Sequence, residues 1–272
     1  MDCWSGGVLF FSKLHYTTTP EHRDSITPQH HNSTTPTNPI PQTTLPMPLP
    51  SAITAVLFDV GQTILSPDYV FMKSMLADFG VTTDYDALAK GAALGREKFL
   101  RGVQGERWKE FFTFWLKHVN ASEQDIPAML KLIHEQHHRV HLWNYLEPTA
   151  RATFAWLRTH GFRMGIISNA DGKVARMMKH LELEHFFECI IDSQLVGVEK
   201  PDPAIFHLVL QALQLAPAAC IYVGDNYDRD VIGARRAGLT PVLLDPFDVV
   251  PEKDVLRIKV LVDLVKLLPR GV

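Results

Sequence analysis

Three apolar runs in the chain each end at polar residues, and they predict strands of a buried parallel sheet. Residues 52–58 lead to Asp59, residues 162–167 to Ser168 and Asn169, and residues 219–224 to Asp225. Short continuous apolar runs are typical of strands buried on both faces. A single acid after a strand more often caps a turn or helix, but three polar endings favour function. Ligands of open parallel sheets bind beyond the carboxyl ends of the strands, so we expect a ligand crevice there.

The second half of the chain alternates between helical and strand patterns. Helices are predicted over residues 149–160, 174–183 and 230–237, and another begins at Pro203 with Asp202 as its N-cap. Gly161 suits a left-handed cap, and short strands are predicted at residues 189–191, 220–223 and 240–244. This βαβαβαβαβ order, with right-handed crossovers, predicts an α/β fold with a doubly wound parallel sheet.

Residues 69–146 have helical spacing throughout, which predicts four or five helices inserted after the first strand. Four aromatic residues of this insert lie on one helix face: Trp108, Phe111, Phe112 and Trp115. We interpret them as the core of a small helical bundle, and a substrate-facing aromatic wall is the alternative. The predicted domains are an α/β core (51–66 and 147–272) and a helical cap (67–146).

Residues 1–50 differ in composition from the rest and predict a disordered, low-complexity tail. Thr, Pro, His, Ser and Asn dominate residues 17–50, leaving little apolar surface to offset the entropy of ordering. The apolar patch at residues 8–11 is too short to cross a bilayer and lacks the features of a signal peptide. We therefore expect neither membrane insertion nor secretion. Met47 is an alternative start, in which case residues 1–46 are not part of the natural protein.

The composition of the chain restricts the classes of function that it could have. The 272 residues carry a formal net charge of -3 and are 46% hydrophobic, which fits a globular chain without the basic face of a nucleic-acid-binding protein. The cysteines are odd in number, Cys3, Cys189 and Cys220, and two lie in predicted strands, where they pack as small hydrophobes. This pattern favours a reducing, cytoplasmic location.

Four histidines have helical spacing and raise the question of a metal site: His134, His137, His138 and His141. Imidazoles one turn apart can share an ion, but no HExxH motif or other local ligand set accompanies them. A helix surface partly facing an interface is the favoured interpretation.

Four segments, in order and at suitable spacing, resemble the motifs of the haloacid dehalogenase (HAD) superfamily of hydrolases. They are residues 58–63, 167–169, 200–201 and 224–230, and the resemblance covers residues 52–270. It is to the subfamily (IA-like) that carries a helical cap after the first motif, and it implies a Rossmann-type core with phosphoryl chemistry. It also implies that Asp59 is the nucleophile and forms an aspartyl phosphate.

The resemblance assigns further roles around Asp59. Thr63, Ser168 and Asn169 would bind phosphate oxygens or position the nucleophile, and Lys200 would pair with both the nucleophile and the transferring group. The implied cofactor is Mg²⁺, held by the residues Asp59, Gly61 (through its carbonyl), Asp225 and, through a water, Asp230.

One position departs from the family pattern. Phosphatases of this family carry a second aspartate two residues after the nucleophile, as the general acid and base, and here Gly61 stands in its place. General acid–base help is worth about 10² to 10⁴ in rate, so ordinary ester hydrolysis should be slow. Three explanations are open: Asp68 replaces the acid, the substrate has a good leaving group such as an acyl phosphate, or the protein binds a phosphorylated ligand without turnover.

Two other reactions of the superfamily are weaker alternatives. Dehalogenases usually carry tyrosine at the position of Gly61 and need no magnesium, whereas this chain keeps the acidic segment 224–230. Phosphonate-cleaving relatives use a cap lysine, but the surroundings of Lys98 do not match their motif. The sequence therefore predicts a Mg²⁺-dependent phosphatase of a small phosphorylated metabolite, acting as a monomer or homodimer. A non-catalytic phospholigand-binding or regulatory protein is the alternative.

Overall fold

A mostly parallel sheet forms the centre of the molecule, as the computed structural model shows for residues 3–5, 8–10, 53–100 and 107–268. Its strand order is β1-β2-β7-β6-β3-β8-β9-β10, and the six strands from β7 to β10 are parallel. The strands are β1 Cys3–Ser5, β2 Val8–Phe10, β3 Ala55–Phe58, β6 Arg163–Ser168, β7 Cys189–Asp192, β8 Cys220–Gly224, β9 Thr240–Leu244 and β10 Leu256–Ile258. The predicted α/β fold with a parallel sheet is confirmed.

Strand β3 lies between β6 and β8, and its four residues are buried because helices cover both faces of the sheet. One hydrophobic cluster includes Val56, Phe58 and residues of helices α5 and α6; the opposite cluster includes Ala55, Leu57 and residues of α8 and α9. The helices of this part are α5 Ala150–Thr159, α6 Val174–His180, α7 Ser193–Val196, α8 Pro203–Leu213, α9 Ile232–Arg236 and α10 Leu264–Leu267. Single turns are η1 Glu184–Phe186, η2 Pro217–Ala219, η3 Tyr227–Val231 and η4 Leu261–Asp263.

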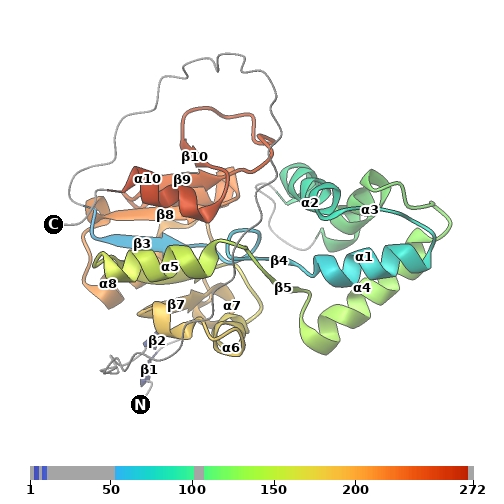
Figure 1. Cartoon of the computed structure of the whole chain (residues 1–272). Coiled ribbons are helices and arrows are strands. Elements are labelled where there is room, and N and C mark those ends of the chain that lie inside the picture. The colour runs from blue at the N-terminus through green and yellow to red at the C-terminus, as the bar shows by residue number, and fades with distance from the viewer. Residues whose placement is uncertain (1–2, 6–7, 11–52, 101–106, 269–272) are drawn as a thin grey trace, which may run out of the picture.

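Four helices form a separate body beside the sheet, joined to it by the antiparallel pair β4 and β5 (Figure 1). They are α1 Tyr69–Asp78, α2 Tyr85–Phe99, α3 Trp108–His118 and α4 Ile126–Val140, and the connecting strands are β4 Leu65–Pro67 and β5 Trp143–Leu146. Phe111, Phe112 and Trp115 are at most 1% exposed within a hydrophobic cluster of this body alone, which fits the core interpretation of the aromatic stripe. The separate cluster supports the predicted cap, whose boundaries stay a prediction.

Local sequence signals mark where several helices of the core begin and end. Asp202 caps α8 by accepting a hydrogen bond from the Ala204 N–H at 2.9 Å, as predicted, and Lys200 lies just before this cap. Gly161 follows α5 with φ 79°, the left-handed conformation that favours glycine. The helix after Asp225 opens with a π-helical turn over Tyr227–Val231, a feature that is frequent at functional sites.

The prediction of disorder over residues 1–50 is wrong for six of them. Cys3–Ser5 and Val8–Phe10 form an antiparallel pair, and β2 pairs with β7 so that Val8 lies opposite Ile191. The open edge of β7 offers unpaired backbone groups, and an apolar, β-prone segment can pair with them. Residues 11–50, with the alternative start Met47, lie outside the described residues.

Among the described residues, no helix combines the length and apolar character needed to cross a membrane. Cys189 and Cys220 are free thiols, buried in β7 and β8.

Candidate active site

A small cavity of about 160 Å³ lies where the carboxyl ends of β3 and β8 face the helical cap. Core residues Asp59, Lys200 and Asp225 line it from one side, and Arg96 and Leu100 of the cap line it from the other. This volume is below the range of about 300–1,000 Å³ typical of pockets for drug-sized ligands. The cavity therefore suits a small metabolite.

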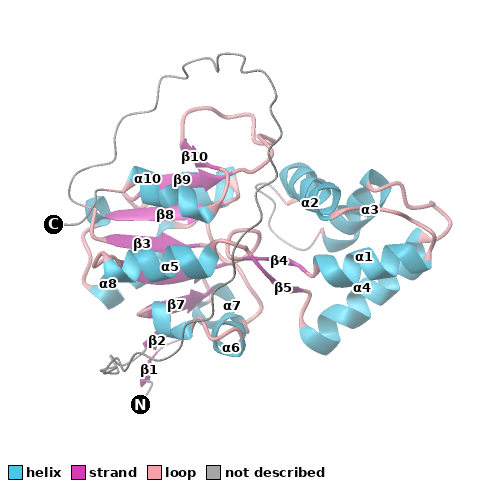
Figure 2. Cartoon of the chain, in the orientation of Figure 1, coloured by secondary structure: helices cyan, strands magenta, loops and turns pink. Residues whose placement is uncertain are grey.

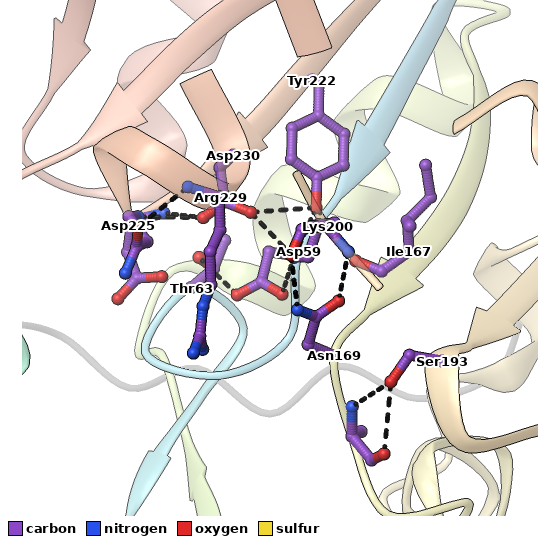
Figure 3. Close-up of polar contacts among 12 residues, drawn as sticks. Asp59, Thr63, Ile167, Asn169, Ser193, Lys200, Tyr222, Asp225, Arg229 and Asp230 are labelled. Atoms are coloured by element: carbon purple, nitrogen blue, oxygen red, sulfur yellow. Dashed lines mark hydrogen bonds and ion pairs between the residues drawn. The ribbon is translucent and has the colours of Figure 1, made fainter. Parts of the chain in front are cut away.

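Lys200 lies at the centre of the polar network (Figure 3). Its Nζ donates to Asp59 Oδ1 at 2.6 Å, to Asp230 Oδ1 at 2.7 Å and to the Tyr222 hydroxyl at 2.9 Å. Burial alone would lower the pKa of Lys200, but Asp230 and Asp59 outweigh it and raise that pKa above its ordinary value. The ammonium group therefore stays charged and holds two carboxylates on one side of the cavity.

Asn169 fixes the backbone that carries Lys200. The Lys200 N–H donates to Asn169 Oδ1 at 2.8 Å, and Asn169 Nδ2 donates to the Lys200 carbonyl at 3.0 Å. Asn169 follows β6 and also lines the cavity. The polar ending of this strand thus positions the lysine loop.

Asp59 extends from the end of β3, and its N–H donates to the Val223 carbonyl of β8 at 2.8 Å. Its Oδ2 accepts a long hydrogen bond of 3.4 Å from Thr63 Oγ1, and Lys200 holds its Oδ1. Burial raises the pKa of Asp59 to about 7; Lys200 opposes this rise, and Asp230 and Asp225 add to it. The cationic side chains of the site thus offset only part of the cost of burying these acids together.

Asp230 organises the loop after β8. Its Oδ2 accepts hydrogen bonds from the N–H groups of Asp225, at 3.1 Å, and Asn226, at 2.9 Å. A Cβ at Gly224 would lie only 2.4 Å from Asp230 Cγ, so this close approach of loop and carboxylate requires glycine. Both carboxylate oxygens of Asp230 therefore have protein partners, one in the loop and one at Lys200.

Three carboxylates could hold a metal ion together. One oxygen each from Asp59, Asp225 and Asp230 lies within 4.8 Å of the others, and all three residues are buried. Burial also raises the pKa of Asp225, although Arg96 opposes this rise. The nearby cations therefore do not fully offset the cost of burying the negative charge of Asp225. Carboxylate oxygens are preferred ligands of Mg²⁺, and a divalent cation would offset the remaining repulsion. The donor set therefore fits the magnesium ion that the family resemblance implies.

The structure brings most of the predicted residues together at the cavity, but two of them do not line it. The residues that line the cavity include Asp59, Gly61, Asn169, Lys200, Asp225 and Asp230. Thr63 and Ser168 are buried and are not among the lining residues found in the described part of the chain. Thr63 donates its long hydrogen bond to Asp59, and Ser168 ends β6 opposite Asp192 of β7. Their direct contact with a phosphate stays a prediction.

Asp68, considered as a replacement for the missing acid, has a different role here. Its Oδ1 accepts the Phe71 N–H at 2.9 Å and so caps α1, and its Oδ2 accepts from Asn144 Nδ2 at 3.1 Å. It is not among the described residues that line the cavity. Lys98 also lies elsewhere, since its Nζ is 4.9 Å from the centre of the Phe114 ring. These positions weaken both the Asp68 hypothesis and the phosphonate-cleaving alternative.

The histidine series does form a group with metal-ligand spacing, together with an acid of the core. Ligand atoms of His137, His141 and Asp171 lie within 4.8 Å of one another. However, His137 Nδ1 accepts the Leu142 N–H at 3.3 Å, which places the proton of the neutral ring on Nε2, and Lys173 pairs with Asp171. The three residues are also at least partly exposed, unlike the buried carboxylates of the active site, so the favoured interpretation remains a helix surface.

Sequence reasoning missed Arg96, Trp143 and Tyr222. Arg96 reaches the cavity from α2, and its Nη1 donates to Asp225 Oδ2 at 2.5 Å. The sequence did contain a sign that Arg96 has a buried partner. The buried face of α2 carries residues four positions apart, Leu88, Ala92 and Arg96, and an unpaired charge on a buried face is costly. Trp143 and Tyr222 reach the site through packing between elements, which local spacing does not reveal.

Comparison with known proteins agrees with this geometry. A family model described as haloacid dehalogenase-like hydrolase matches residues 53–238, so the chain belongs to this family. A solved structure of a HAD phosphatase from Thermococcus onnurineus has a TM-score of 0.54 and 26% identity, covering 80% of this chain and 99% of that one. The family and the helical insert inferred from the four motifs are therefore confirmed.

Curated relatives of the chain carry different names. The haloacid dehalogenase-like hydrolase domain-containing protein 3 of Bos taurus is 34% identical over 130 residues, 47% of this chain and 51% of that protein. The chain thus spans about half the length of this relative, and 54% of its Xenopus laevis counterpart. The glyceraldehyde 3-phosphate phosphatase of Methanopyrus kandleri is 29% identical over 201 residues, 70% of this chain and 83% of that protein.

Proposed function

We propose that this protein is a Mg²⁺-dependent phosphatase that hydrolyses a small phosphorylated metabolite through an aspartyl phosphate on Asp59. The observation that carries the proposal is the position of Asp59. Asp59 lies at the end of the central strand β3 and accepts a hydrogen bond from Lys200 at 2.6 Å. Two further carboxylates lie close to it at a small cavity. Binding alone would not require a nucleophile in this arrangement.

The chemistry has two displacements at phosphorus. An Asp59 carboxylate oxygen attacks the phosphorus atom, the bond to the leaving oxygen breaks, and the aspartyl phosphate forms. Water then attacks the same phosphorus, the bond to Asp59 breaks, and inorganic phosphate leaves with the carboxylate restored. Lys200 offsets the repulsion between the carboxylate and the phosphate dianion, and Asn169 keeps this lysine in place.

Asp59, Asp225, the Gly61 carbonyl and, through a water, Asp230 would hold the magnesium ion. When bound, Mg²⁺ would neutralise part of the charge on the transferring phosphate. The support for this assignment is the cluster of three buried carboxylates whose oxygens lie within 4.8 Å of one another. The structure of a HAD hydrolase from Bacillus subtilis that shares the fold at 20% identity was determined with magnesium bound.

Because glycine stands at position 61, no carboxylic acid at this position can protonate the leaving oxygen in the first displacement. The leaving oxygen then has to take its proton from water, which slows esters of ordinary alcohols far more than acyl phosphates. We therefore expect good leaving groups to react fastest. Relatives named glyceraldehyde 3-phosphate phosphatase and phosphoglycolate phosphatase support a small phosphorylated substrate.

The test is phosphate release from a panel of acetyl phosphate, p-nitrophenyl phosphate and sugar phosphates, with Mg²⁺ or with a chelator. Wild-type protein should release phosphate only with Mg²⁺, and Asp59→Asn should lose that release. The matched control is Asp68→Asn, which removes an acid outside the cavity and should keep the activity.

A non-catalytic phospholigand-binding protein is the second candidate, and the glycine at position 61 is what favours it. In that case wild type and Asp59→Asn would show equal, negligible release across the panel. Calorimetric binding of the same phosphates would then persist in wild-type protein. Mg²⁺-dependent release that requires Asp59 would exclude this candidate.

A further inference from the structure

Arg96 has hydrogen-bonding capacity that the described residues do not use. Its side chain is 5% exposed, and of its three nitrogens only Nη1 has a partner, Asp225. Nε and Nη2 are buried and have no hydrogen-bond partner among the described residues. Leaving donors of a buried guanidinium unpaired is costly, so a group that binds them would be stabilised.

The geometry of the unused donors indicates what such a group is. Nε–H and Nη2–H point from the same edge of the guanidinium plane, as a pair of parallel donors. This edge matches the two oxygens of a carboxylate in bidentate fashion. Because Asp225 binds at Nη1, it leaves the whole edge free.

The position of Arg96 indicates which part of a substrate it meets. Asp59 and Lys200 lie at the strand ends of the core, where the transferring phosphate would bind under the proposed function. Arg96 comes from α2 on the cap side, near Leu100 and Trp143, and lines the same cavity. The leaving group of a phosphate bound at Asp59 would therefore face Arg96.

We propose that Arg96 is a specificity residue that binds a carboxylate in the leaving-group part of the substrate. The substrate class is then small phosphate esters of hydroxy acids, whose size suits a cavity of about 160 Å³. This inference rests on the proposed function. It goes further by naming the chemical group of the substrate, a carboxylate, that the cap binds.

A matched pair of substrates tests the inference in wild-type protein. 2-Phosphoglycolate and ethyl phosphate both have two carbons, but only the first carries a carboxylate. Wild type should prefer 2-phosphoglycolate by about 10- to 100-fold in kcat/KM, the range expected for charge-assisted bidentate hydrogen bonds. It should also reject phosphoethanolamine, whose ammonium would face the guanidinium. Equal rates on all three would overturn the inference.

Variants then separate Arg96 from the rest of the site. Arg96→Gln should reduce the preference for 2-phosphoglycolate over ethyl phosphate to near unity, and Arg96→Lys should restore only part of it because a lysine offers no parallel donors. Arg139→Gln, an exposed cap arginine, is the matched control and should keep the wild-type ratio. If Arg96 instead bound the transferring phosphate, Arg96→Gln would lower both rates equally and the ratio would stay unchanged, which contradicts the proposal.

Binding gives a readout that does not depend on turnover. In the Asp59→Asn background, calorimetry should show 2-phosphoglycolate binding more tightly than ethyl phosphate, and the added Arg96→Gln change should abolish that difference. If no phosphate is released from any substrate, acetyl phosphate included, the proposed function fails while this binding difference still tests Arg96. Equal binding of the two compounds, alongside normal release of phosphate, would overturn the role of Arg96 alone.

Discussion

Gly61 is the residue at which this site differs most from a complete phosphatase site, and it can be changed. A Cβ built at this position would lie 3.8 Å from Trp143 Nε1, an ordinary contact, so a side chain fits. Gly61→Asp should raise kcat on ethyl phosphate by up to about 10² to 10⁴, because the new carboxyl can protonate the leaving oxygen. The gain on acetyl phosphate should be much smaller. Steady-state kinetics on the two substrates checks this.

Gly61→Asn is the control for that change, since it fills the same space but cannot donate a carboxyl proton. It should leave the ratio of the two rates at its wild-type value. An equal gain from Asp and Asn would attribute the effect to space or rigidity, and no gain from Asp would show that the acid comes from elsewhere.

Cys189 and Cys220 are the second residue-scale test. Burial raises the pKa of the Cys189 thiol to about 12 and that of Cys220 to about 11. At pH 8 the reactive thiolate would then be only about 10⁻⁴ and 10⁻³ of each thiol, against roughly a quarter for an ordinary cysteine. Iodoacetamide should therefore modify both very slowly in the folded protein and rapidly in urea, as site-resolved mass spectrometry would show. Equal rates in the two conditions would contradict the buried positions.

Among the site residues, those that directly follow a predicted strand could be predicted from the sequence. Asp59, Asn169 and Asp225 follow apolar runs, and the topology of a parallel sheet brings such endings together. Lys200 came from the resemblance to a family motif. Arg96 was not predicted, because its place at Asp225 depends on how α2 packs over the core, a contact 129 residues apart in sequence.

Among the elements, the packing of α2 on α3 depends on a glycine. A Cβ at Gly91 would lie 2.6 Å from Trp115 Cδ1 and 2.9 Å from His118 Cδ2, so the aromatic side chains of α3 occupy that space. Gly91→Ala should lower the free energy of unfolding by about 1–3 kcal/mol through overpacking, less the gain of about 1 kcal/mol in helix propensity. Urea unfolding followed by circular dichroism measures the difference.

The control for Gly91→Ala separates packing from propensity. Lys90→Ala changes the neighbouring residue of the same helix, and helix propensity alone predicts almost no effect there. If Gly91→Ala proved more stable than wild type, the two helices would have to lie further apart than the structure shows.

Helices and strands were the most predictable elements because each has its own period and end signals. Asp202 and Pro203 mark the start of α8, and Gly161 marks the end of α5. The strands β1 and β2 were not predictable in this way. The segment at residues 8–10 pairs with β7 through backbone groups, and only the assembled sheet shows that this edge is open.

In the described part of the chain, the helical cap is joined to the sheet body through β4 and β5 (Figure 2). The cap has a hydrophobic cluster of its own, and polar contacts at the cavity connect it to the core as well. Arg96 of α2 pairs with Asp225, and Asn226 Nδ2 donates to the Leu100 carbonyl at 3.3 Å. These contacts make the cap part of the site wall. Closure of such a cap excludes water from the reaction and selects the substrate.

Magnesium should therefore stabilise the molecule as a whole. Asp59, Asp225 and Asp230 are buried together, and burial raises the pKa of Asp59 to about 7 despite Lys200. A cation that binds only the folded protein adds about 2.7 kcal/mol at 100 times its Kd, which corresponds to roughly 5–10 °C in Tm for a domain of this size. The Tm of the wild-type protein measured in Mg²⁺ should therefore be higher than its Tm in EDTA by this amount. Asp225→Asn should remove most of this difference in Tm. Asp202→Asn, which changes a helix cap outside the cluster, should keep it. Equal Tm values for wild type in Mg²⁺ and in EDTA would show that the cluster does not bind the ion.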